Sequence, residues 1–131
     1  MTVHGTPAPP NPRGGELWWV TFDPAIGSEI KKTRTAVVVS SDSIRTLPVR
    51  IVVPFTEWKA KHEGRPWVVR VEPSSLNGLG KVVAAETMQI RCMAVEKTRF
   101  HQCIGTLEAE LLEEVTAAVA LIVEYGGPDS K

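Results

Sequence analysis

Three cationic side chains lie close together near the start of the chain, and they are the best candidates for contacts with an anion. Lys31 and Lys32 belong to a polar loop predicted over 25–33, which contains Gly27. Arg34 ends this loop, directly before an apolar run that predicts a rigid strand. A guanidinium presents a planar fork of donors that matches phosphate oxygens, and it stays protonated at neutral pH. We therefore expect Arg34 to stabilise negative charge and the two lysines to contact phosphate groups, although loop lysines also serve simply to solvate a surface.

A second group of candidates follows the next predicted strand. Thr56 ends that strand, and its hydroxyl could bond a phosphate oxygen or hold a reacting group in line. The alternative is a β-branched residue that only completes the strand. Trp58, in a charged connection predicted over 57–65, could stack on an unpaired base. Trp18 and Trp19 lie within a strand and are predicted to be core residues.

The residues that most often transfer protons or bind metals are scattered along the chain. His4, His62 and His101 each lack a neighbouring partner in the sequence, so we predict that none is catalytic. Cys92 and Cys103 are too few for a disulfide scaffold and match no zinc pattern, so we interpret both as ordinary thiols. The sequence therefore predicts no metal and no cofactor.

Short strands must position these candidates, because apolar residues recur at strand spacing over most of the chain. Strands are predicted over 16–22, 35–40, 49–56, 66–72, 81–93 (either continuous or broken) and 103–107, with one helical turn over 41–47. The first segment is apolar on both faces, which predicts a strand covered on both sides. A helix is predicted over 108–124, with Thr106 as its N-cap. The pattern predicts a mainly β fold with a C-terminal α-helix, a small twisted antiparallel sheet or open barrel.

Length and charge bound the class of protein further. The 131 residues suffice for one domain, predicted over 14–125, between a flexible Pro-rich tail over 1–13 and a short tail over 126–131. The sequence shows no bilayer-spanning run and no signal-peptide pattern, so we expect a cytoplasmic protein without membrane contact. Fourteen of the 15 basic residues but only nine of the 15 acidic residues precede Glu108, a net charge of +5 there. That asymmetry fits either an anionic partner or an ordinary mixed surface.

Several short motifs, taken in order, resemble the MazF/PemK family of toxin ribonucleases. They are Gly15-Glu16-Leu17-Trp18 with Phe22-Asp23-Pro24, Gly27-Ser28-Glu29 with Arg34 and the strand at 36–40, Val53-Pro54-Phe55-Thr56, Asn77-Gly78-Leu79, Gln89-Ile90-Arg91, and Lys97-Thr98-Arg99-Phe100 with Ile104-Gly105-Thr106-Leu107. An ordered set of motifs is far more specific than any one of them. The chain departs from the family pattern at Thr35, where relatives often carry proline. It also departs at Met88, where relatives often carry an acid before the glutamine; the nearest acid here is Glu86.

The resemblance implies an SH3-like or CcdB-like sheet that forms a homodimer and cleaves single-stranded RNA at a short sequence. The neighbouring 2′-hydroxyl would attack the phosphorus without a metal, leaving a 2′,3′-cyclic phosphate and a 5′-hydroxyl. The resemblance implies Arg34 and Thr56 as catalytic residues, and Glu29 as a general base or a group that orients Arg34. RNA binding would fall to Gln89, together with Lys31, Lys32 and Trp58. It also implies a MazE-like antitoxin, whose disordered acidic tail we expect to cover the groove at Arg34.

Two other functions remain open at this point. One is a toxin of the same fold that binds DNA gyrase without catalysis, as CcdB does through a C-terminal Trp-Gly-Ile. This chain ends in Gly-Gly-Pro-Asp-Ser-Lys, which disfavours that function. The other is a nucleic-acid-binding module that has lost its cleavage activity. This alternative stays open because Met88 stands where relatives often carry an acid.

Overall fold

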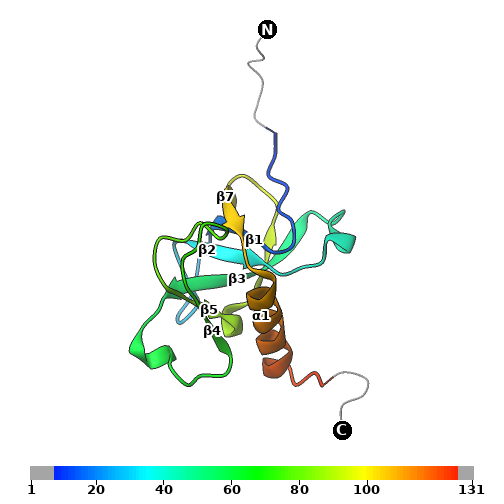
Figure 1. Cartoon of the computed structure of the whole chain (residues 1–131). Coiled ribbons are helices and arrows are strands. Elements are labelled where there is room, and N and C mark those ends of the chain that lie inside the picture. The colour runs from blue at the N-terminus through cyan, green and yellow to red at the C-terminus, as the bar shows by residue number, and fades with distance from the viewer. Residues whose placement is uncertain (1–7, 127–131) are drawn as a thin grey trace.

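Seven strands, three 3₁₀ turns and one α-helix make up the computed structural model, which describes residues 8–126. The strands are β1 (Glu16–Thr21), β2 (Thr33–Val38), β3 (Val49–Glu57), β4 (Val68–Val71), β5 (Val83–Glu86), β6 (Arg91–Ala94) and β7 (Phe100–Thr106). The turns are η1 (Asp42–Ile44), η2 (Ala60–His62) and η3 (Thr87–Gln89), and α1 is Ala109–Ile122. The predicted mainly β class with a C-terminal helix is confirmed (Figure 1). His4 and the outer parts of both predicted tails lie outside the described residues.

The strands form an antiparallel sheet that remains open. Its order is β4-β5-β3-β2-β1-β7, and β6 pairs separately with β3. The nine-residue strand β3 changes partners along its length: its start pairs with β6, its middle with β2 and its end with β5. This change of partners bends the sheet around β3. The broken strand predicted over 81–93 is therefore two strands, β5 and β6, separated by η3.

Apolar side chains pack on both faces of the central strands, as predicted for the segment that became β1. Leu17 joins a cluster between the sheet and α1, whereas Val20 belongs to a cluster on the opposite face. Trp18 is half-buried and packs edge-on against Phe100, with ring centroids 5.9 Å apart. The prediction that Trp19 is a core residue is wrong, since its side chain is 40% exposed. Trp19 lies beyond the edge of the Leu17 cluster, where it borders a surface hollow instead of a covering element.

Helix α1 begins at the predicted place but is capped differently. The N-cap residue is Glu108, so the prediction of Thr106 is wrong. The Glu108 carboxylate accepts hydrogen bonds from Ser74 Oγ and Asn77 Nδ2, and the bond from Ser74 is the main cause that lowers its pKa. These contacts tie the start of the helix to the turn after β4 and leave Thr106 in β7. The helix packs against β4 and η3, beside the sheet (Figure 1).

Arg50 on β3 attaches the N-terminal segment to the sheet. Its guanidinium is 4% exposed and donates to the carbonyl oxygens of Pro12, Leu47 and Val49 and to Asn11 Oδ1. A buried charge with several hydrogen bonds is costly to disturb. The chain is therefore held to the domain from Asn11 onward.

Within residues 8–126, no helix has the length and apolar character needed to span a bilayer.

Candidate active site

The pairing of β2 with β3 brings Arg34 and Thr56 together. Ala36 on β2 lies opposite Pro54 on β3. The two strands are antiparallel, so the position two residues before Ala36 lies opposite the position two residues after Pro54. Side chains two residues apart point to the same face of a strand, and Arg34 and Thr56 therefore lie side by side on one face. Both residues line one cavity of about 400 Å³. The structure thus unites the two catalytic candidates that are 22 positions apart in the sequence.

Four segments of the chain enclose this cavity. Ser28 and Ile30 come from the loop before β2, and Gln89 comes from η3. Glu86 ends β5. The remaining lining residues beyond Arg34 and Thr56 are Glu57, Lys59, Lys61, His62 and Arg65, from the end of β3 and the connection to β4. Lys59, Lys61 and Arg65 are exposed at the rim of the cavity, and they add positive charge to that of Arg34.

Arg34 is held at one nitrogen and free at the other two. Its Nε donates to the carbonyl oxygen of Lys31 at 3.2 Å. Within the described residues, its two terminal nitrogens have no hydrogen-bond partner, and the side chain is half-buried. The guanidinium therefore presents the two-donor edge that binds a phosphate in a bidentate way.

A buried hydrogen-bond network stands beside Arg34 in the same cavity. Thr56 Oγ1 donates to Glu86 Oε2 at 3.0 Å, and His62 Nε2 lies 3.0 Å from the same oxygen. The His62 side chain is 1% exposed and that of Glu86 is 18% exposed. The sequence did not predict a role for His62, because its partner is 24 residues away and no local motif joins them. Glu86 was visible only as the acid nearest to Gln89.

The loop before β2 is anchored by residues from distant segments. Gln89 uses both ends of its amide here, because Oε1 accepts from Ile30 N and Nε2 donates to the Ser28 carbonyl oxygen. Arg91 donates to the Phe22 carbonyl oxygen, and Arg99 donates to those of Thr21 and Asp23. These contacts hold the loop that ends at Arg34.

Glu29 lies apart from the Arg34–Thr56 pair. Its Oε1 accepts from Ile26 N within the loop, at 2.9 Å. It lines a neighbouring hollow with Phe22 and Met88, whereas the cavity that holds Arg34 does not include it. The structure therefore offers Glu86, rather than Glu29, as the carboxylate beside the two catalytic candidates.

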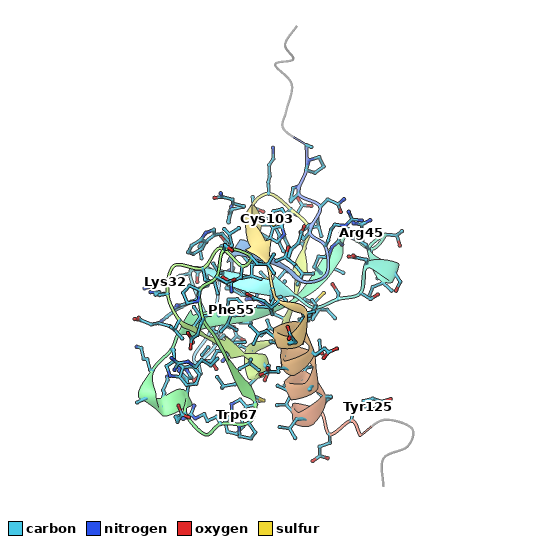
Figure 2. All side chains as sticks on the ribbon, in the orientation of Figure 1. Lys32, Arg45, Phe55, Trp67, Cys103 and Tyr125 are labelled. Carbon is cyan, nitrogen blue, oxygen red and sulfur yellow. The ribbon has the colours of Figure 1, made fainter. Side chains whose placement is uncertain are left out.

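The predicted RNA contacts lie at the edges of the site. Lys31 and Lys32 are exposed on the loop, and Lys32 projects from the periphery while Phe55 lies in the interior (Figure 2). The Trp58 ring is 5.3 Å from that of His62 and has the Arg70 guanidinium 5.1 Å above it. Trp58 thus packs against His62 and Arg70 and does not itself line the cavity. Cys92 and Cys103 are free and exposed. The described residues contain no group of three or more His, Cys, Asp or Glu side chains arranged to hold a metal ion.

The fold and this cavity define a small antiparallel-sheet protein whose arginine, hydroxyl and carboxylate are suited to bind and polarise a phosphate diester. A family model described as a PemK-like, MazF-like toxin of type II toxin-antitoxin systems matches residues 13–123, and the chain belongs to this family. It is 36% identical over 115 residues to "Endoribonuclease MazF9" of Mycobacterium tuberculosis. The aligned region covers 83% of this chain and 93% of that protein.

Solved structures of the same fold agree. The crystal structure of MazF (Form-I) from Deinococcus radiodurans superimposes with a TM-score of 0.71 at 24% identity, covering 86% of this chain and 96% of that chain. A mycobacterial endoribonuclease in complex with its cognate antitoxin superimposes with a TM-score of 0.67 at 16% identity, covering 89% of this chain and 99% of that chain. These similarities establish the fold, a small open antiparallel sheet with a C-terminal helix.

Proposed function

We propose that this toxin is an endoribonuclease that cleaves single-stranded RNA by attack of a 2′-hydroxyl on the adjacent phosphate. The observation that carries the proposal is the single cavity in which the free edge of Arg34 lies beside Thr56 and Glu86. The endoribonuclease name of the 36% identical relative supports it. The site acts within the cytoplasm, where a toxin meets messenger RNA.

The three groups divide the chemistry among them. Glu86 takes the proton from the 2′-hydroxyl through Oε1, which accepts no hydrogen bond from the described residues. The 2′-oxygen then bonds to phosphorus while the bond from phosphorus to the 5′-oxygen breaks, and solvent water protonates the leaving oxygen. Arg34 stabilises the extra negative charge on the phosphorane, a task that needs a fixed positive charge rather than a metal. Thr56 donates its hydroxyl proton to Glu86 Oε2 and so helps to hold that carboxylate beside the scissile phosphate.

An adjoining hollow extends the site toward a longer substrate. It has a volume of about 250 Å³ and shares Arg34, Thr56 and Glu57 with the main cavity. Its far side is lined by Trp19, whose exposed indole can stack on an unpaired base. Phosphate contacts from exposed Lys31 and Lys32 position the strand without reading its sequence. Gln89 acts in this scheme by holding the loop against the cavity.

A fluorescent single-stranded RNA assay in EDTA tests the proposal. We expect cleavage to products with a 2′,3′-cyclic phosphate and a 5′-hydroxyl, because the site's charge comes from side chains. The matched control is the same oligonucleotide with one 2′-deoxy nucleotide at the cut position, which should bind and remain intact. Binding of the all-ribose RNA without cleavage would instead support a decayed nucleic-acid-binding module.

We also propose that the toxin is a homodimer that is silenced by a small MazE-like antitoxin. The solved mycobacterial relative was determined with its cognate antitoxin. Here the cationic rim of Lys59, Lys61 and Arg65 would attract an acidic segment of the antitoxin. We expect the antitoxin to cover the Arg34 cavity and therefore to compete with RNA.

Competition is measured by fluorescence anisotropy with a labelled, uncleavable 2′-deoxy oligonucleotide. The cognate antitoxin should release the oligonucleotide in proportion to its own occupancy. A stable ternary complex, in which both ligands stay bound at saturation, would show that the antitoxin binds elsewhere.

A further inference from the structure

A histidine is buried in the wall of the cavity, although histidines are usually found where water can reach them. The His62 side chain is 1% exposed and ends the short turn η2. The Trp58 ring covers it at a centroid distance of 5.3 Å. A buried polar ring must have its hydrogen bonds satisfied, so its two nitrogens define what it does.

The two contacts of the imidazole fix its tautomer. Nδ1 accepts the backbone N–H of Lys59 at 2.9 Å, so this nitrogen carries no proton. In the neutral ring the proton is then on Nε2, which donates to Glu86 Oε2 at 3.0 Å. A doubly protonated ring would bring two donors face to face at Lys59. The backbone of η2 therefore selects the form of His62 that donates to the carboxylate.

His62 and Thr56 both direct their donors to the same oxygen of Glu86. We propose that His62 is a positioning residue for the cleavage reaction: it locks the Glu86 carboxylate by Oε2 and thereby aims Oε1 at the 2′-hydroxyl. This inference rests on the proposed ribonuclease function and on Glu86 as the proton acceptor. His62 itself does not touch the RNA.

A physical consequence follows from two donors on Oε2. A glutamate side chain has several rotatable bonds, and two hydrogen bonds from rigid elements remove most of that freedom before substrate arrives. Loss of the Nε2 donor should therefore slow the chemical step while leaving RNA binding nearly unchanged.

Other charged side chains line the same cavity. They are Arg34 from β2, Glu57 from β3, and Lys59, Lys61 and Arg65 from the connection between β3 and β4. No charged side chain comes from η3, which is Thr87–Gln89. Because none of these groups changes in the variants below, a change in kcat reports on the contact between His62 and Glu86.

Two substitutions test the hydrogen bonds of the two His62 nitrogens separately. In His62→Asn, the amide oxygen takes the place of Nδ1 and still accepts from Lys59, but residue 62 no longer reaches Glu86, which keeps only the hydrogen bond from Thr56. In His62→Gln, the amide nitrogen takes the place of Nε2 and still donates to Glu86. We expect kcat on single-stranded RNA to fall about 10- to 100-fold in His62→Asn with little change in KM. His62→Gln should restore kcat to within about fivefold of the unchanged protein.

Each result decides one question. If the unchanged protein cuts RNA and His62→Asn cuts it with the same kcat and KM, the positioning role is wrong while the ribonuclease function stands. If both variants lose kcat equally and their thermal unfolding temperatures fall together, His62 serves only the fold. If the unchanged protein cuts no RNA, the proposed function itself fails. A double variant with Glu86→Gln should be no slower than Glu86→Gln alone, because His62 acts through that carboxylate.

Discussion

Arg34→Ala is expected to lower kcat for RNA cleavage by about 10²- to 10³-fold, the size of effect seen when a preorganised donor to a developing negative charge is removed. The physical reason is the free edge of the guanidinium. Nε donates to the Lys31 carbonyl oxygen, which orients the group, and the two terminal nitrogens have no hydrogen-bond partner among the described residues of a side chain that lines the cavity. KM should change much less than kcat, since the extra charge on phosphorus exists only in the transition state. Single-turnover cleavage of a labelled RNA measures both quantities.

Two variants serve as controls for Arg34→Ala. Arg34→Lys keeps a positive charge but loses the planar fork, so it should retain part of the activity while remaining at least about tenfold slower. Lys31→Ala removes an exposed side chain of the same loop and should weaken RNA binding and its salt dependence, with kcat unchanged. A Lys31→Ala protein as slow as Arg34→Ala would show that the loop's total charge matters and that the guanidinium has no special position.

Glu86→Gln is expected to lower kcat by about 10²- to 10⁴-fold, the range for removal of a general base. The amide has nearly the same shape, and its oxygen can still accept from Thr56 and His62 at the place of Oε2. The fold should therefore be kept, as thermal unfolding can verify, while the capacity to take a proton is lost.

Glu29→Gln is the matched control for Glu86→Gln. Its carboxylate accepts from Ile26 N and lines a different hollow, so its loss should change kcat by no more than about threefold. The opposite outcome, a slow Glu29→Gln beside an active Glu86→Gln, would return the role of general base to the loop and contradict the assignment made from the cavity. Glu57→Gln provides a third comparison, because Glu57 lines the cavity but is exposed at the end of β3.

The parts of the site that the sequence could predict depend on neighbours in the chain. Arg34 follows a polar loop and precedes a buried strand, and Thr56 ends the strand that pairs with it. Both positions follow from strand alternation and from an ordered set of motifs. The strand apolar on both faces was equally predictable, because that pattern requires cover on both sides.

The remaining features depend on contacts between distant residues. Glu86 and His62 meet only because β3 pairs with β5 and the connection after β3 folds back over that pair. Thr106 looked like a helix cap, but it belongs to β7, and the N-cap is Glu108, whose carboxylate is bonded to Ser74, 34 residues away. Trp19 looked like a core residue because it is a large aromatic residue on a predicted strand. It lies outside the buried cluster that contains Leu17, and its side chain is therefore exposed. A single sequence displays none of these contacts.

The reacting groups and the rim of the cavity belong to different kinds of structure. Arg34, Thr56 and Glu86 lie on paired strands, whereas Lys59, Lys61 and Arg65 come from a segment between β3 and β4 whose only regular element is the turn η2. Such a segment tolerates changes of length and composition far better than the sheet does. The groups that break the bond and the side chains that surround them can therefore vary independently. We expect a graft over 59–61 and 63–67, which spares Trp58 and His62, to change which RNA sequences are cut while Arg34, Thr56 and Glu86 stay in place.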